Sequence, residues 1–272
     1  MNPTVRRKNA LHLAFIIQFM LALAPVYAGP PFLTDDPDPV PYHHWELYTF
    51  AQGDRTRSTN SIESPAIEIN NGIAPNTQIH LIVPDEHYTQ PGLNASGLGD
   101  TELGIKYRFL TETAARPEIG IFPMAELSTG DSSKGLGNGK TWYRLPIWLQ
   151  KSEGRVTFDG GGGEALNSEA GQKNYSFGGL LTQYELNATL TLGGEIFLQG
   201  AQADSVTEPA LDSSGQYYQV PGARSSAIWN VGGYYNFTPD FSLLFSGGHS
   251  FNGDGNSIFY VSLYRTWGPG SP

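Results

Sequence analysis

The sequence predicts an all-β protein, a transmembrane antiparallel up-and-down β-barrel of about twelve strands. Three observations support this fold class: long runs of alternating apolar and polar residues, connectors that are alternately short and long, and an N-terminal segment typical of exported proteins. A strand that crosses a bilayer at a tilt needs about 9–11 residues, whereas strands of soluble domains usually have about 5–6. The runs in this chain have the length that a membrane requires.

The N-terminal segment, residues 1–28, has the three parts of a secretory signal peptide. Residues 6–8 (Arg-Arg-Lys) are basic, residues 11–24 are almost wholly apolar, and residues 26–28 (Val-Tyr-Ala) match the pattern that signal peptidase accepts. The apolar stretch is shorter than the roughly 20 residues of a membrane-spanning helix, so an uncleaved anchor is the less favoured alternative. The sequence therefore predicts cleavage after Ala28 and export to the outer membrane of a Gram-negative cell.

Composition excludes several classes of function. The chain has 16 Lys and Arg residues against 26 Asp and Glu residues, and loss of the signal peptide makes this balance more acidic. Nucleic-acid binding is not expected, because it depends on neutralising phosphates. The chain contains no cysteine, which excludes disulfides, Cys-ligated metals and thiol catalysis. The predicted mature chain has no Gly-rich phosphate loop, and no cofactor is expected.

Period-2 alternation identifies the strands. Between residues 227 and 237 every second residue is Ala, Trp, Val, Gly, Tyr or Phe. The predicted strands are 44–52, 62–71, 76–84, 100–110, 116–129, 141–151, 155–162, 174–185, 188–203, 225–237, 241–250 and 257–267. An even number of strands suits a single-chain outer-membrane barrel with both termini in the periplasm. Aromatic residues near strand ends, Tyr48, Tyr264 and Trp267 among them, are expected to form girdles at the membrane interfaces.

The connectors distinguish a barrel from a soluble β-sandwich, which composition and alternation alone leave open. Barrels of this kind have short periplasmic turns and longer extracellular loops. The long connectors, rich in Gly, Ser, Asn, Asp and Pro, are 53–61, 85–99, 130–140, 163–173, 204–224 and 251–256. The short ones are 72–75, 111–115, 152–154, 186–187 and 238–240. The regular alternation of long and short favours the barrel, which we place at residues 44–267 with a short C-terminal tail at 268–272.

Residues 29–43 precede the first strand and are rich in Pro and Asp. Proline has no N–H to donate to a strand ladder, so this segment is not expected to be a paired strand. Two alternatives stay open at this point: a periplasmic extension, or a plug folded into the lumen.

Several local patterns resemble the outer-membrane protein family named after a protein of the meta pathway of phenol degradation. They are residues 30–37 (PPFLTDDP), 45–46 (WE), 71–76 (NGIAPN), 97–109 (GLGDTELGIKYRF), 126–130 (ELSTG) and 146–151 (PIWLQK). The resemblance covers nearly the whole predicted mature chain, and the 97–109 block is its most specific part. It implies an outer-membrane barrel that takes up or exports small, often aromatic compounds, with no catalytic residues to carry over. The chain departs from outer-membrane barrels that end on an aromatic residue read by the barrel-assembly machinery, because five residues follow Trp267.

Polar residues opposite in parity to the apolar set are the candidate lumen-lining residues. They are Glu46, Glu68, His80, Glu102, Lys106, Arg108, Glu118, Glu126, Arg144, Trp148, Asp159 and Glu195. Gln150 and Arg155 are assigned inward with them, and Trp148 has two further inward aromatic companions, Phe122 and Trp142. Such charges either pair across the lumen and fix its shape or line a selective path. The acidic excess favours cationic or neutral solutes.

An enzyme and a metal site are both disfavoured. Residues 248–253 (GHSFNG) resemble lipid-hydrolase signatures in composition, but neighbouring residues on a strand face opposite sides, so His249 and Ser250 do not share a site. The acidic stretches 35–38 and 252–256 lack the twelve-residue spacing and closing Glu of a calcium loop. No catalytic, cofactor-binding or metal residues are assigned.

The sequence thus predicts a narrow porin-like passage through which small solutes diffuse passively. Its expected partners are outer-membrane lipid, a small-molecule solute and the barrel-assembly machinery. The alternatives are a non-transporting structural or adhesion barrel and, less favoured, an outer-membrane lipid hydrolase. The solute, the direction of transport, the oligomeric state and whether the lumen is open are not determined by the sequence.

Overall fold

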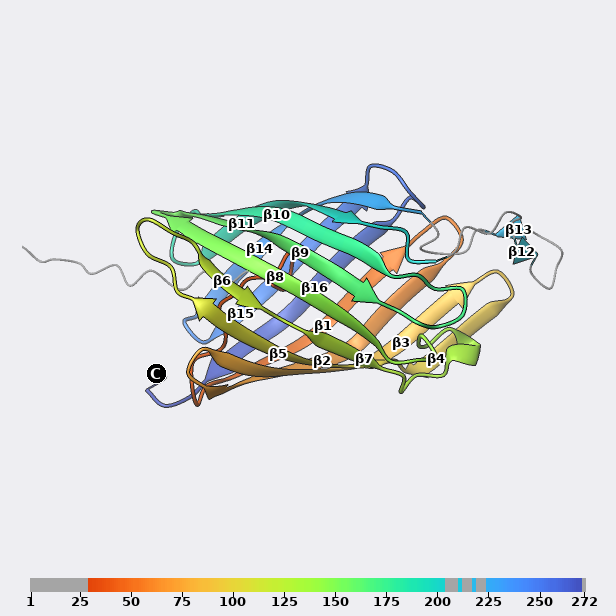
Figure 1. Ribbon diagram of the computed structural model, residues 1–272, viewed down its shortest axis with the longest axis horizontal. Coiled ribbons are helices and arrows are strands. Elements are labelled where there is room, and N and C mark those ends of the chain that lie inside the picture. The colour runs from red at the N-terminus through yellow and green to blue at the C-terminus, as the bar shows by residue number, and fades with distance from the viewer. Residues whose placement is uncertain (1–28, 204–209, 212–216, 219–223, 271–272) are drawn as a thin grey trace, which may run out of the picture.

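The computed structural model confirms the all-β fold: the described residues form a closed antiparallel barrel of twelve strands (Figure 1). The structure describes residues 29–203, 210–211, 217–218 and 224–270. The predicted signal peptide lies outside these residues. No helix in the described ranges is long and apolar enough to span a membrane.

The strands follow one another around the barrel, each antiparallel to its neighbours. They are β1 (Trp45–Arg55), β2 (Asn60–Ala74), β3 (Thr77–Gln90), β4 (Leu93–Leu98), β5 (Thr101–Leu110), β6 (Glu118–Ile121), β7 (Met124–Leu127), β8 (Trp142–Glu153), β9 (Val156–Leu166), β10 (Tyr175–Glu185), β11 (Leu190–Gln199), β14 (Ser226–Thr238), β15 (Phe241–Ser250) and β16 (Ser257–Trp267). β4 continues into β5 along β3, and β6 with β7 makes a single crossing of the wall. The barrel closes where β1 pairs with β16.

The end of the barrel that carries the short turns also carries the first residue of β1 and the last residue of β16. Trp45 pairs with Trp267 there, and their rings stack with centroids 6.4 Å apart. The long connectors lie at the opposite end. We call these the short-turn end and the long-loop end, which correspond to periplasm and exterior in outer-membrane barrels.

The predicted connector 85–99 was wrong in part. β3 runs on to Gln90, turns at Pro91-Gly92, and returns as β4, so most of this stretch is a hairpin that extends beyond the barrel wall. Gly92 has a φ of 80°, and proline followed by such a glycine is the sequence of a type II turn. The polar residues of 85–96 obscured the strand because a hairpin in water need not show an apolar face.

The predicted strand 116–129 is interrupted at Phe122-Pro123, between β6 and β7. Proline has no N–H for the ladder, and a break or bulge is the usual result. The Phe122 side chain is buried at this break. The connector 204–224 contains two two-residue strands, β12 (Ala210–Leu211) and β13 (Tyr217–Tyr218), and connector 130–140 contains one turn of 3-10 helix, η1 (Ser132–Lys134).

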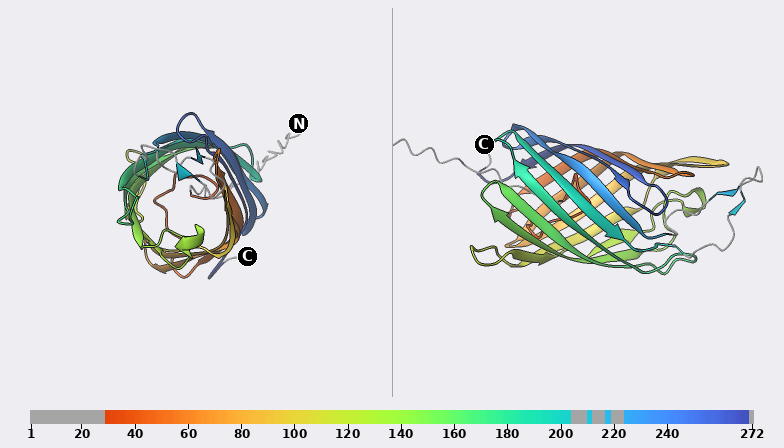
Figure 2. Two further views of the ribbon diagram at one scale, coloured as in Figure 1. Left: turned by 90° about the vertical axis from the view of Figure 1, so that its right-hand side faces the viewer. Right: turned by 90° about the horizontal axis from the view of Figure 1, so that it is seen from above.

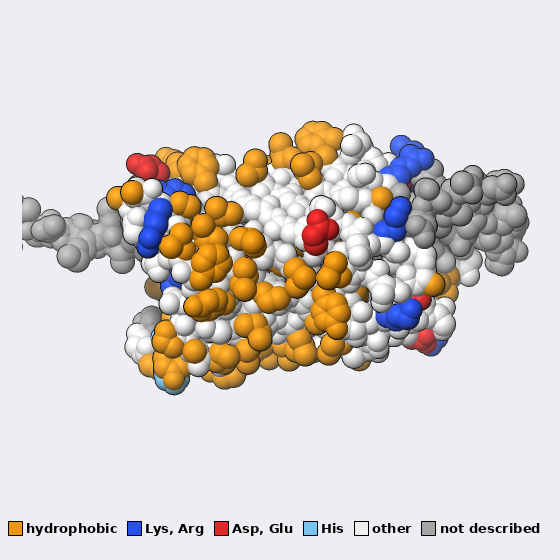
Figure 3. Space-filling view, viewed as in Figure 1, with side chains coloured by type: hydrophobic (Ala, Val, Ile, Leu, Met, Phe, Trp, Pro, Cys, Tyr) orange, Lys and Arg blue, Asp and Glu red, His pale blue; other side chains and the backbone are white. Residues whose placement is uncertain are grey.

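The outer wall is apolar. Leu180, Ile196, Val231 and Val261 belong to a large set of Leu, Ile, Val and Phe side chains on the outer face that are 40% or more exposed. In Figure 3 apolar side chains spread over the wall, and Lys and Arg gather toward the two ends. A soluble protein rarely exposes such an apolar surface, whereas a membrane requires it.

The position of Val261, halfway along β16 on the outer face, gives a direct test of membrane insertion. Replacing Val261 by Arg puts a charge near the bilayer midplane and should lower the free energy of unfolding from lipid vesicles by about 2–4 kcal/mol. Phe251→Arg is the control, because Phe251 lies in the connector after β15 and is 65% exposed. Denaturant unfolding in vesicles measures both, and equal costs would contradict the predicted position of the bilayer.

Candidate functional site

The N-terminal segment, residues 29–43, lies within the barrel along most of its length (Figure 2). Its backbone is held by side chains of the wall. The backbone N–H groups of Leu33 and Thr34 each donate to the Glu195 carboxylate at 2.8 Å, and the N–H of Val40 donates to Gln78 at 2.8 Å. The segment therefore runs down the lumen from β11 toward the short-turn end at β2 and β3.

Lys106 joins the segment to β5 by charge. Its Nζ lies 3.0 Å from Asp35 Oδ1 and 3.0 Å from Asp36 Oδ1. Lys106 and Asp36 are almost fully buried, 5% and 1% exposed. Ion pairs in such surroundings are much less screened by solvent than surface pairs.

A second pairing lies nearer the short-turn end. Arg108 pairs with Asp38 of the segment and, at 3.0 Å, with Glu118 of β6. Burial raises the pKa of the Asp38 carboxyl above its usual range, and the positive charges of Arg108 and Lys106 oppose this rise. Three of the predicted inward residues, Lys106, Arg108 and Glu195, thus bind the segment directly.

Two glycines of the barrel wall make room for the N-terminal segment because they have no side chain. A Cβ atom at Gly179 of β10 would lie 2.0 Å from Thr34 Oγ1, and one at Gly72 would lie 2.1 Å from the Pro41 carbonyl oxygen. Real Cβ atoms do not approach other atoms so closely, so these positions accept the segment only as glycine.

A polar network covers the lumen wall opposite the segment's contacts with β11. His80 bonds through Nδ1 to Asn70 at 2.7 Å and through Nε2 to Glu102 at 2.8 Å. Asn70 in turn donates to Glu68 at 2.8 Å, and Arg144 of β8 pairs with Glu102. These residues come from β2, β3, β5 and β8, so the network joins four strands across the inner wall.

Two tyrosines complete this network at Glu46. The hydroxyl of Tyr264 donates to Glu46 at 2.7 Å and that of Tyr48 donates to it at 3.1 Å. Both rings are buried. The prediction that Tyr48 and Tyr264 belong to an interfacial girdle was therefore wrong: their parity is that of Glu46, and proximity to a strand end does not decide the face.

Inside the barrel, aromatic side chains gather on β8, β10 and β11 and at the break between β6 and β7. Phe122, Trp148 and Phe197 are buried, and Phe177 packs against them with its ring centroid 6.4 Å from Trp148 and 6.2 Å from Phe197. Phe122 also meets the His80 ring edge-on, with centroids 5.2 Å apart. Within the described part of the chain, the buried Trp148 Nε1 has no hydrogen-bond partner.

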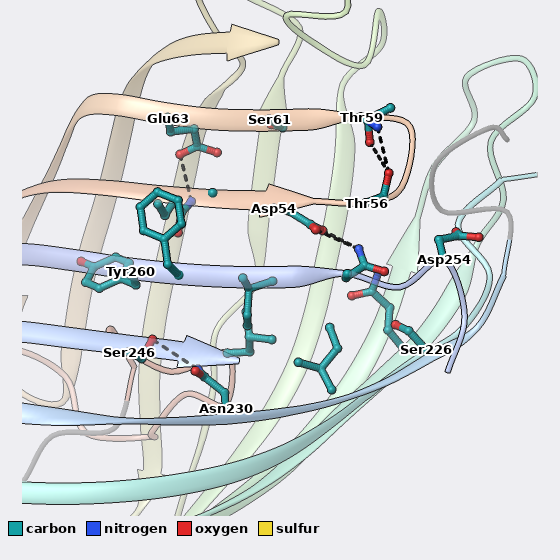
Figure 4. Close-up of a pocket in the computed structure, with 18 of the residues that line it drawn as sticks. Asp54, Thr56, Thr59, Ser61, Glu63, Ser226, Asn230, Ser246, Asp254 and Tyr260 are labelled. Carbon is teal, nitrogen blue, oxygen red and sulfur yellow. Dashed lines mark hydrogen bonds between the residues drawn. The ribbon is translucent and has the colours of Figure 1, made fainter. Parts of the chain in front are cut away.

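Two of the cavities in the lumen meet at the N-terminal segment. One, of about 530 Å³, is at the long-loop end and has hydroxyl, amide and carboxylate groups on its wall, including Asp54, Glu63 and Asp254 (Figure 4). The other, of about 270 Å³, lies deeper, between the polar network and the aromatic wall. Pro30, Phe32 and Leu33 line both cavities, so the first residues of the N-terminal segment stand at their boundary.

All twelve candidate lumen residues lie on the inner face, where nine are buried and Arg108, Glu126 and Arg144 are half-buried. Glu126 pairs with Arg144 at 3.2 Å, and Asp159 accepts hydrogen bonds from Gln150 and Gln183 at 2.7 and 3.1 Å. Four amide side chains that bond the lumen carboxylates or the N-terminal segment were not among the predicted lumen residues, although all have the inward parity. They are Asn70, Gln78, Gln183 and Asn230.

The prediction that Arg155 faces the lumen was wrong. Arg155 is exposed in the turn between β8 and β9, where its guanidinium donates to the Leu186 carbonyl oxygen at 3.3 Å.

The two residues of the hydrolase-like stretch lie on opposite faces: His249 is exposed and bonds Ser257, whereas Ser250 is buried. Among the described residues, no group of His, Asp and Glu side chains is arranged to hold a metal ion.

Comparison with known proteins shows the fold. No family model matches the chain, and no curated protein matches it in sequence. A solved outer-membrane channel from Pseudomonas putida F1 superposes with a TM-score of 0.65 at 15% identity, covering 85% of this chain and 98% of that one. The NanC porin gives a TM-score of 0.54 at 11% identity, covering 80% and 98%, and the translocator domain of the autotransporter NalP from Neisseria meningitidis gives 0.51 at 12%, covering 82% and 89%. The chain has the fold of outer-membrane β-barrels.

The pairing of Lys106 with Asp35 and Asp36 predicts that loss of the Lys106 charge detaches residues 29–43 from the barrel wall. Lys106→Met leaves the buried Asp36 and the partly buried Asp35 without their counter-charge, and breaking a buried pair in this way costs about 3–5 kcal/mol. The segment should become accessible to added protease in the folded barrel. Lys151→Met is the matched control, since Lys151 pairs with Glu112 at 2.7 Å in a half-exposed setting where such a pair contributes about 1 kcal/mol or less. Equal protease resistance of the two variants would contradict this role of Lys106.

Proposed function

We propose that the protein is a passive channel for small solutes in the outer membrane, with residues 29–43 as its constriction. The observation that carries this proposal is the division of the lumen: cavities of about 530 and 270 Å³ meet at residues 30–33, which belong to the segment and not to the wall. Barrels of about eight strands are filled by side chains, and those of 16–18 strands hold an open channel. A twelve-stranded barrel lies between, so one short segment is enough to narrow it.

The lining of the two cavities favours cationic and neutral solutes. Glu46, Glu68 and Glu102 line the deeper cavity together with Lys106 and Arg144, and the cavity at the long-loop end has three carboxylates and Arg224. The carboxylates are the more numerous, and a channel with such a lining attracts cations.

The aromatic wall favours solutes that carry a ring. An apolar cavity of about 150 Å³ already accommodates benzene, and the deeper cavity has about 270 Å³ beside Phe122, Trp148 and Phe197. The resemblance to the phenol meta-pathway family supports the same class of solute.

Single-channel conductance of the signal-free protein in a planar bilayer tests this proposal. Discrete current steps are expected, and they should become larger when residues 29–43 are deleted, because the deletion joins the two cavities. Insertion of the protein is verified independently by protease protection. If neither inserted protein gives current steps, the channel proposal is wrong. The second candidate, a closed structural or adhesion barrel, would then be favoured, and the many contacts between segment and wall would explain why it is closed.

Ion selectivity gives a second test. Glu63 lines the cavity at the long-loop end and accepts from Gln52 at 2.9 Å. In alkaline buffer, where Glu63 is ionised, Glu63→Gln keeps the shape and removes one negative charge, so the ratio of cation to anion permeability should fall. Glu164→Gln is the control, because Glu164 is exposed and bonds Ser176 at 2.5 Å on the outer face of the barrel. Reversal potentials in a salt gradient measure the ratio, and an unchanged value in Glu63→Gln would argue against this route for ions.

A further inference from the structure

The buried anchor around Lys106 lacks one positive charge. Asp35 and Asp36 both contact the single ammonium of Lys106, at 3.0 Å each. Asp36 and Lys106 are buried, so bulk water compensates little of the remaining negative charge. The next cation along the lumen, Arg108, is already paired with Asp38 and Glu118. A second cation beside Asp35 and Asp36 would balance the cluster.

Gly29 lies at the place where this cation is missing. It is buried, and a Cβ atom built on it would be 3.0 Å from Asp35 Oδ1 and 4.0 Å from Asp36 Oδ2. The Gly29 nitrogen is bonded to the same Cα, and its N–H donates to the Thr34 carbonyl oxygen at 3.3 Å. The nitrogen of residue 29 is thus within a few ångströms of both carboxylates.

We infer that cleavage after Ala28 converts the Gly29 nitrogen into an α-ammonium group that pairs with Asp35 and Asp36 inside the barrel. Cleavage replaces a neutral amide with one N–H by a cation with three, one of which can keep the bond to Thr34. The group supplies the missing positive charge and fixes the start of the N-terminal segment at the boundary between the two cavities. The inference rests on the predicted cleavage site and does not depend on whether the barrel conducts.

Residue 29 also has the backbone that this arrangement needs. Its φ of 101° is in the region that favours glycine, and any larger residue would bring its Cβ against Asp35. The signal peptidase pattern asks for small residues before the cut and makes no such demand after it. Glycine as the first mature residue is therefore explained by the lumen and not by the peptidase.

Three forms of the chain test the inference. The first begins at Gly29 with a free amino group; the second is acetylated there, which removes the charge; the third is dimethylated there, which adds bulk and keeps the charge. Both modifications are made on the unfolded chain at a pH where the α-amino group, with a pKa of about 7.7–8.0, reacts in preference to lysine at about 10.4. Each form is refolded, and the rate at which added protease cuts within residues 29–43 is measured.

Acetylation should raise this rate about tenfold or more, as loss of a buried charge pair predicts. Dimethylation keeps the charge and one N–H, so it should raise the rate clearly less than acetylation does. In an Asp35→Asn background the effect of acetylation should shrink, because one partner is already gone. Equal rates for the free and acetylated forms would overturn the inference. So would mass spectrometry of protein exported by a Gram-negative host, if it showed a first residue other than Gly29.

A second measurement tests the inference even if the acetylated form does not refold. The dimethylated terminus, labelled with ¹³C, can be titrated by NMR in the folded barrel and in the denatured chain. Carboxylates within about 4–6 Å stabilise the charged form and should raise the pKa of this group by about one unit or more on folding. An equal or lower pKa in the folded protein would overturn the pairing.

Discussion

In hydrocarbon every backbone N–H and C=O must be paired, so a sheet that crosses a membrane has to close on itself. The pairing of β1 with β16 satisfies this requirement along the whole length of both strands. Closure then fixes two surfaces of opposite character, since alternate residues face lipid and lumen. A Lys or Arg on the lipid side near the bilayer midplane costs about 2–4 kcal/mol, so most charges of the strands face the lumen. Glu164 of β9 is an exposed exception on the outer face.

Charges gathered in a narrow lumen create a second requirement, because each needs a partner there. The strands meet part of it among themselves, as in the pairing of Arg144 with Glu102 and Glu126. For Lys106 and Glu195 the partners come from the N-terminal segment. The segment and the wall are thus complementary halves of one polar interior, and the same contacts that stabilise the barrel decide how wide its passage is.

Most of the fold could be predicted from the sequence, because strand length, period and connector alternation are local properties. The β16 strand agrees with its prediction at both ends, residues 257 and 267. The inward face was also predictable, since parity follows from period 2. What parity cannot give is which residues meet across the lumen. The bond from Tyr264 to Glu46, and the bonds that hold Leu33 and Thr34 on Glu195, depend on barrel closure and join residues more than 100 positions apart.

The way Glu195 holds the N-terminal segment has an evolutionary consequence. The carboxylate binds the backbone N–H groups of Leu33 and Thr34 and not their side chains. Leu33 is 41% exposed, so mutation at position 33 can accumulate without loss of the anchor, short of proline. Position 195 has no such freedom, because only a carboxylate accepts two N–H groups and the Asn230 amide at once. The residue at position 33 can therefore change during evolution while the glutamate at position 195 is retained.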